Sequence, residues 1–127
     1  MHQAAHVGAD EVVGPGRQRV LHFLLISGDD LLTPALIACG GEGIISVLGN
    51  AFPKRFADLT RAALAGDFAA ARAGLFRFLT LNPMMYEESN PVGVKAALEA
   101  LGVCGPAVRL PLLEATGGLK ERIRKLL

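Results

Sequence analysis

Hydrophobic residues over positions 20–26 form an almost unbroken run, without the alternation of apolar and polar side chains that marks a strand exposed on one face. Such a run is typical of a strand buried on both faces in a parallel sheet. A second short apolar run follows at 43–47. Between the two lies a helix-like stretch over 30–39, which Gly40 and Gly41 close. This order and spacing predict a βαβ unit, with parallel strands and a right-handed connection.

From position 53 onward, apolar residues recur at helical spacing and no further strand is predicted. A first helix is expected to end at Gly66, and Asp67 is the expected N-cap of a second helix, which Asn82 and Pro83 break. The residues expected to face inward in these two helices are Phe56, Leu59, Ala63, Phe68, Ala71, Leu75, Phe78 and Leu79.

Two more helices complete the pattern. Asn90 is the expected cap of the first, with Pro91 at its first helical position and Gly102 after its end. The second is expected over 118–126, where basic side chains complement the helix dipole. Because two parallel strands are too few to be covered on both faces, the pattern predicts the end of a larger α/β protein. The inward positions of these helices are Val94, Ala97, Leu98, Leu101, Leu119, Ile123 and Leu126.

The composition of the chain says more about its binding partners than about its fold. The 127 residues include 13 basic and 12 acidic side chains, which gives no electrostatic reason to expect nucleic acid or an anionic membrane as a partner. The apolar runs are shorter than the ~20 residues that cross a bilayer, and positions 1–16 do not have the form of a secretory signal. We therefore expect a soluble, cytoplasmic protein. Its thiols, Cys39 and Cys104, are expected to be reduced and buried rather than joined in a disulfide.

Several motifs, in the same order and at similar intervals, resemble the dihydrodipicolinate synthase and N-acetylneuraminate lyase family. They are Leu-Ile-Ser-Gly-Asp-Asp-Leu-Leu from position 25, the glycine-rich segment at 40–50, the stretch at 88–98 with its Asn-Pro-x-x-x-Lys form, and Arg-Leu-Pro from position 109. In that family the first two motifs belong to the seventh and eighth strands of a TIM barrel, and the others belong to a helical extension.

The resemblance therefore implies an α/β fold, namely a partial TIM (β/α)8 barrel followed by a C-terminal helical extension. It divides the chain into three regions. Residues 1–16 are an irregular leader, residues 17–66 are the last two βα units of the barrel, and residues 67–127 are the helical region.

The resemblance also implies a chemistry, that of a pyruvate-dependent lyase in lysine and diaminopimelate biosynthesis. In the family, a lysine on the sixth strand forms a Schiff base with pyruvate, and the enamine attacks aspartate semialdehyde. Burial lowers the pKa of such a lysine and frees its amine as a nucleophile. Residues 1–19 contain no lysine, so we expect a truncated chain without the catalytic group, inactive alone. Part of the pyruvate pocket is assigned by resemblance to Ile45 and Gly28, with no cofactor and no metal.

Other candidate residues have plainer structural interpretations. Lys95 is the first lysine to test for covalent chemistry, although a structural role is simpler, and solvent exposure is expected for Lys54, Lys120 and Lys125. Tyr86 is interpreted as a packing residue rather than a proton relay. Asp29 and Asp30 could form an acid–base pair of carboxylates, but capping of the following helix accounts for them better. Without the resemblance, Ile45 would be interpreted as core.

Two apparent motifs are rejected. His2 and His6 are four positions apart, but no helix is expected around them, and His22 lies within an apolar strand, so no metal site is predicted. The glycine-rich segment at 40–43 precedes a strand instead of opening a helix and lacks Gly-Lys-Ser/Thr, which excludes a phosphate loop.

Three hypotheses remain open. The chain is a fragment or truncated form of a synthase, one part of a split enzyme that completes its barrel with another polypeptide, or a non-catalytic helical interaction module. The apolar strands count against the module, because a free-standing module should be polar where the barrel would cover it. Exposed strand edges further predict self-association or aggregation, or a partner chain that supplies the missing strands.

Overall fold

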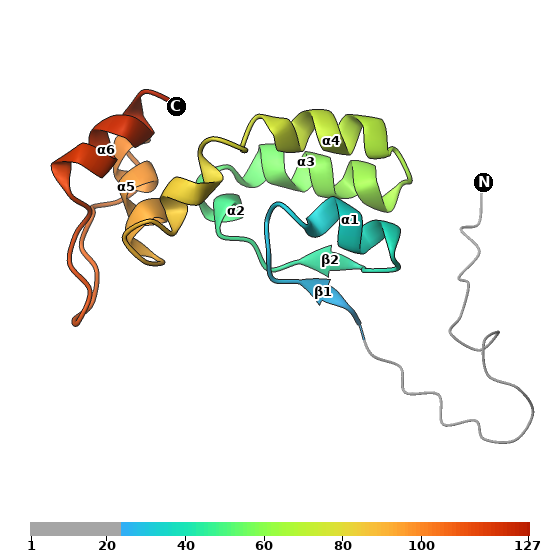
Figure 1. The fold of residues 1–127 in the computed structure, drawn as a ribbon, viewed down its shortest axis with the longest axis horizontal. Helices are drawn as coiled ribbons and strands as arrows, with labels where there is room; N and C mark the ends of the chain where they lie inside the picture. Colours follow the sequence, from blue (N-terminus) through green and yellow to red (C-terminus); the bar gives the residue numbers. More distant parts are fainter. Residues whose placement is uncertain (1–23) are drawn as a thin grey trace, which may run out of the picture.

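A computed structural model describes residues 24–127, and these form a helix-rich α/β chain with one short sheet (Figure 1). The elements follow in the order β1 (Ile26–Ser27), α1 (Thr33–Ala38), β2 (Gly43–Ile44), α2 (Leu48–Ala51), α3 (Pro53–Leu64), α4 (Phe68–Phe76), the 3-10 helix η2 (Asn82–Met85), α5 (Val92–Ala100) and α6 (Gly117–Arg124).

The predicted parallel pairing of the two strands is confirmed. Ile26 lies opposite Gly43 and Ser27 opposite Ile44, and α1 connects the strands. The Glu42 amide donates to the Leu25 carbonyl at 2.8 Å, and the Ile45 amide donates to the Ser27 carbonyl at 2.9 Å. The strands are shorter than the apolar runs that predict them, because within the described residues each strand has only one neighbour. Positions 20–23 of the first run lie outside these residues.

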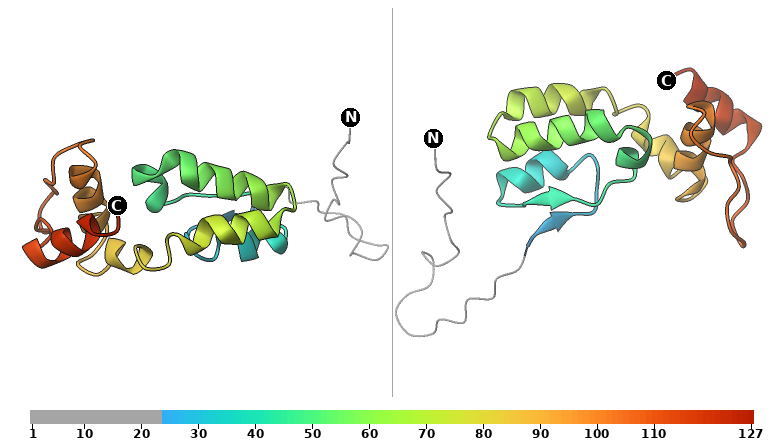
Figure 2. Two further views of the ribbon diagram at one scale, coloured as in Figure 1. Left: turned by 90° about the horizontal axis from the view of Figure 1, so that it is seen from above. Right: turned by 180° about the vertical axis from the view of Figure 1, so that it is seen from behind.

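The helices lie in two groups at opposite ends of the chain's long axis (Figures 1 and 2). At one end, α3 and α4 form an antiparallel hairpin that packs on α1, with the sheet beyond it. At the other end, α5 packs against α6 and η2. The short helix α2 contacts both α3 and α5, so it bridges the two groups.

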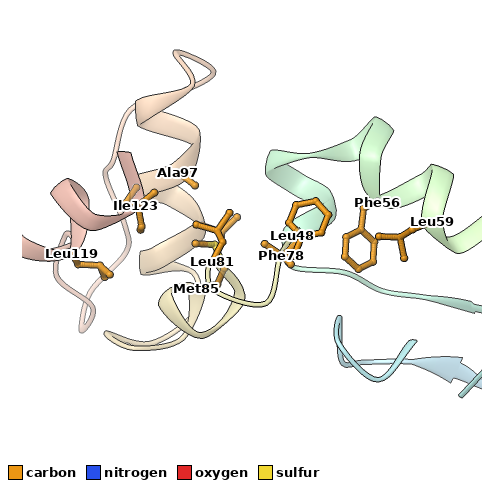
Figure 3. Close-up of a cluster of buried hydrophobic side chains, with 11 residues drawn as sticks. Leu48, Phe56, Leu59, Phe78, Leu81, Met85, Ala97, Leu119 and Ile123 are labelled. Atoms are coloured by element: carbon orange, nitrogen blue, oxygen red, sulfur yellow. The ribbon is translucent and has the colours of Figure 1, made fainter. Parts of the chain in front are cut away.

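One apolar core continues from the first group into the second (Figure 3). The Phe78 ring lies 5.3 Å from the Phe52 ring and 5.7 Å from the Phe56 ring, measured between centroids. A smaller cluster joins α1, α3 and α4. Most predicted inward positions are therefore confirmed as buried. The main core contains Leu48, Phe56, Leu59, Phe78, Leu81, Met85, Val94, Ala96, Ala97, Leu119 and Ile123.

Four predicted inward positions are wrong: Phe68, Leu79, Leu101 and Leu126 are between 38% and 45% exposed. The last three lie beyond the ends of α4, α5 and α6, where a helical period no longer places a side chain on the buried face. Phe68 is the first residue of α4. The sequence pattern thus locates the helices well and their last turns poorly.

The signals at the helix ends are partly confirmed. Gly66 has φ +82°, and the Asp67 carboxylate accepts a hydrogen bond from the Ala70 amide at 2.9 Å, as expected of a stop followed by an N-cap. The prediction for α5 is wrong by one position. Pro91 is its cap, and Asn90 makes no capping hydrogen bond.

Other surface predictions have mixed outcomes. Cys39 and Cys104 are free thiols, but both are exposed rather than buried. Lys54 and Lys125 are solvated as expected. The Lys120 side chain is only 17% exposed, because it pairs with Glu99 at 2.9 Å and Glu114 at 3.6 Å, which contradicts the expectation for that lysine. None of the described helices is long and apolar enough to cross a membrane.

Candidate functional site

The candidate site lies where the two strands end. Ser27 pairs with Ile44, so the next residue on each strand, Gly28 and Ile45, emerges at the same edge of the sheet. Ile45 is 77% exposed, not buried core. A Cβ atom built on Gly28 would meet no atom within 4 Å, so the space next to Gly28 is open in the described chain. The structure therefore places the two residues side by side, at the carboxyl ends where parallel strands carry binding sites.

Hydrogen bonds fix the loop that follows β1. The hydroxyl groups of Ser27 and Thr33 donate to the Asp29 carbonyl at 2.9 and 2.7 Å, and both side chains are buried. The Asp29 carboxylate accepts from the backbone amides of Leu31 and Leu32, at 2.8 and 2.9 Å. Asp29 therefore caps the turn that leads into α1, which agrees with the capping interpretation.

Asp30 has a different role from the one its position suggests. It is 1% exposed, and one carboxylate oxygen accepts from the Leu48 amide at 2.8 Å, at the start of α2. Its other oxygen is buried without a hydrogen-bond partner among the described residues. Of the two aspartates considered for capping, Asp29 therefore caps the turn before α1, and Asp30 does not. Instead, Asp30 joins the loop after β1 to the segment after β2, and local sequence could not show a contact 18 positions away.

Tyr86, at the end of η2, has a pKa that depends on the charges of this loop. Partial burial raises the pKa of its phenol above the usual value, and the negative charges of Asp30 and Asp29 raise it further, because both disfavour the phenolate. Tyr86 remains 40% exposed, so it is a residue of the rim rather than of the core. No local pattern in the sequence links position 86 to positions 29 and 30.

Because Tyr86 is the only tyrosine, this pKa can be measured directly from phenolate absorbance. We expect Tyr86 to titrate above free tyrosine, and Asp29→Asn to bring the midpoint down towards it, because the amide removes a nearby charge but keeps an oxygen for capping. Glu87→Gln is the control, since this neighbour in sequence does not contribute to the shift. An unperturbed midpoint in the wild-type chain would contradict the described surroundings of Tyr86.

The lysines do not gather at this edge. Lys54 lies on α3, Lys95 on α5, and Lys120 and Lys125 in or after α6. The Lys95 ammonium instead lies 3.5 Å from the Cys104 sulfur. Among residues 24–127 no three His, Cys, Asp or Glu side chains are placed to hold a metal ion. The histidines considered for a metal site lie outside the described residues: His2, His6 and His22.

The groups around this edge are an exposed apolar side chain, open space at a glycine, a capped acidic loop and a phenol with a raised pKa. Parallel strands joined by a helix, with such loops at their carboxyl ends, define an α/β protein whose candidate site lies at the strand ends.

Comparisons with known proteins make this class specific. The model of the dihydrodipicolinate synthetase family matches residues 16–127, so the chain belongs to that family. A 4-hydroxy-tetrahydrodipicolinate synthase from Cytophaga hutchinsonii is 50% identical over 103 residues, which cover 81% of this chain and 35% of that protein.

Solved structures agree. Dihydrodipicolinate synthase from Aquifex aeolicus is 39% identical, with a TM-score of 0.77, over 82% of this chain and 36% of the other. The enzyme from Acinetobacter baumannii, solved in complex with pyruvate, is 32% identical, with a TM-score of 0.78. The match covers 82% of this chain and 36% of the other. These relatives are TIM-barrel lyases, and the present fold is consistent with part of such a barrel. The chain spans about a third of the length of the relatives it matches.

Proposed function

We propose that this chain forms one wall of the pyruvate pocket of a dihydrodipicolinate synthase-type lyase, and that the Schiff-base lysine is supplied by other residues. The observation that carries the proposal is the placement of Gly28 beside Ile45, at the carboxyl ends of paired parallel strands. Both residues lie within the motifs that resemble the family, and a related protein has been solved in complex with pyruvate. In this assignment Ile45 contacts the pyruvate body and Gly28 leaves room for it.

The same proposal assigns the regions of the chain. Residues 17–66 would be the last two βα units of the barrel, residues 67–127 the helical extension, and residues 1–16 an irregular leader. Asp30 would hold the two strand-end loops together through its hydrogen bond to Leu48. The working protein would be cytoplasmic, like other enzymes of amino-acid biosynthesis.

The exposure of the sheet supports the proposal that a partner completes the barrel. The apolar side chains of Leu24, Ile26 and Ile45 are 65%, 44% and 77% exposed. A shallow cavity of about 420 Å³ lies between β2 and α3, lined among others by Ile44, Phe56 and Leu64. Uncovered apolar strands and an open groove are expected where further strands and helices would pack. Self-association through these surfaces is the expected behaviour of the chain without that partner.

The proposal can be tested by reconstitution. This chain would be expressed with a polypeptide corresponding to the part of the Cytophaga hutchinsonii relative that it does not match, and condensation of pyruvate with aspartate semialdehyde would be measured. We expect activity only from the pair. Ile45→Asp should reduce the rate at least about 100-fold, because a misplaced pyruvate loses the alignment on which the reaction depends.

Leu127→Asp is the matched control, since it places the same charge at the partly exposed C-terminal residue. It should leave the rate within about twofold of wild type, as expected of a surface substitution. Undiminished activity of the Ile45→Asp pair would contradict the assignment of Ile45. Activity of this chain by itself would contradict the proposal that the Schiff-base lysine lies outside this chain.

A further inference from the structure

A second groove lies on the opposite side of α3 from β2 and shares no residue with the strand-end site. It runs between α3 and α4 and has a volume of about 380 Å³, within the range of small-molecule sites. Small side chains leave it open, because α4 contributes Ala70, Ala73 and Gly74 to its walls. A Cβ atom on Gly74 would lie 2.9 Å from the Leu59 Cβ atom, so the two helices approach each other closely at that point.

One end of the groove is positively charged. Arg55, in the first turn of α3, and Arg77, just after α4, both line it, and the antiparallel hairpin brings these helix ends together. Within the described chain neither guanidinium has an ion-pair partner. The hairpin as a whole is basic, with five basic and two acidic residues between positions 53 and 80.

The single acidic residue of the groove does not neutralise this end. Asp58 pairs with Lys54 at 2.7 Å and with Arg61 at 3.5 Å. The hydrogen bond from Lys54 lowers the pKa of the Asp58 carboxyl, so it stays charged at neutral pH. The two guanidinium groups at this end can hold one carboxylate, and the rest of the groove is largely apolar, so a ligand with a terminal carboxylate and an apolar body fits it.

We propose that the groove between α3 and α4 binds an elongated organic anion with a single carboxylate. The carboxylate would accept hydrogen bonds from Arg55 and Arg77, and the apolar body would lie along the floor formed by Leu59, Ala62 and Ala73. This proposal is independent of the pyruvate pocket, because none of these residues belongs to it.

Octanoate is a suitable probe, and its binding to the complete chain can be measured by isothermal titration calorimetry. We expect saturable binding at one site. The Arg55→Gln/Arg77→Gln double variant should bind octanoate at least about tenfold more weakly, because it loses the charge-assisted hydrogen bonds. Uncharged 1-octanol should also bind at least about tenfold more weakly than octanoate, for the same reason.

Two further variants separate this groove from unspecific binding to the exposed strands. Ala73→Leu should weaken octanoate binding by filling the groove without changing its charge, and a thermal melt would verify that it folds. Arg72→Gln removes an arginine of α4 that does not line the groove and should change the affinity less than about twofold. Absence of octanoate binding, equal binding by the double variant or by 1-octanol, or an equal loss in Arg72→Gln would each overturn the proposal.

Discussion

Replacing Phe56 by alanine should lower the free energy of unfolding by about 3–5 kcal/mol, the usual cost of deleting a large buried aromatic side chain. Phe56 is 2% exposed and packs against the Phe78 ring in the core that links the two groups of helices. Urea unfolding followed by circular dichroism would measure the loss.

Phe76→Ala provides the control on the same hairpin. Phe76 is 58% exposed at the end of α4, so its removal leaves no cavity and should change stability by about 0.5 kcal/mol or less. Equal effects of the two substitutions would show that the core does not join α3 to the segment after α4 as described.

Gly93→Ala should be the most damaging change that adds only a methyl group. A Cβ atom at Gly93 would lie 2.3 Å from the Met84 carbonyl oxygen and 2.5 Å from the Met85 Cα atom, both in the backbone of η2. Because backbone cannot yield as a flexible side chain does, α5 and η2 must separate. We expect a loss of about 3 kcal/mol, at the upper end of the range for overpacked cores, measured as a lower urea midpoint.

Gly118→Ala is the matched control in α6. A methyl group there would meet no atom within 4 Å, and alanine is the better helix former, so this variant should be more stable by about 0.5–1 kcal/mol. A Gly93→Ala protein as stable as wild type would contradict the close approach of α5 to η2.

Much of the fold could be predicted because its signals are local. Apolar periodicity places α3 and its stripe of Phe56, Leu59 and Ala63, and the pair Gly66–Asp67 marks the turn before α4. Unbroken apolar runs predict parallel strands, and this also holds. The extent of each strand could not be predicted in the same way, since it depends on hydrogen bonds to neighbouring strands and not on the residues alone.

The candidate site was only partly predictable for a related reason. Its two named residues came from motif resemblance, and their adjacency follows from the register of the strands. The contacts that organise the loops are distant in sequence. Asp30 accepts a hydrogen bond from the Leu48 amide instead of capping the helix next to it, and its charge raises the pKa of Tyr86. No local pattern distinguishes Asp30 from Asp29, although one is buried and the other is not.

The central claim is that this chain supplies a wall of the pyruvate pocket while the nucleophilic lysine lies outside it. The most direct test is intact mass spectrometry of the reconstituted pair after incubation with pyruvate and borohydride, which traps a Schiff base irreversibly. The predicted result is one adduct on the other polypeptide, formed with wild-type chain and strongly reduced with Ile45→Asp. A stoichiometric adduct on the present chain, with Lys95 as the first position to map, would contradict the account.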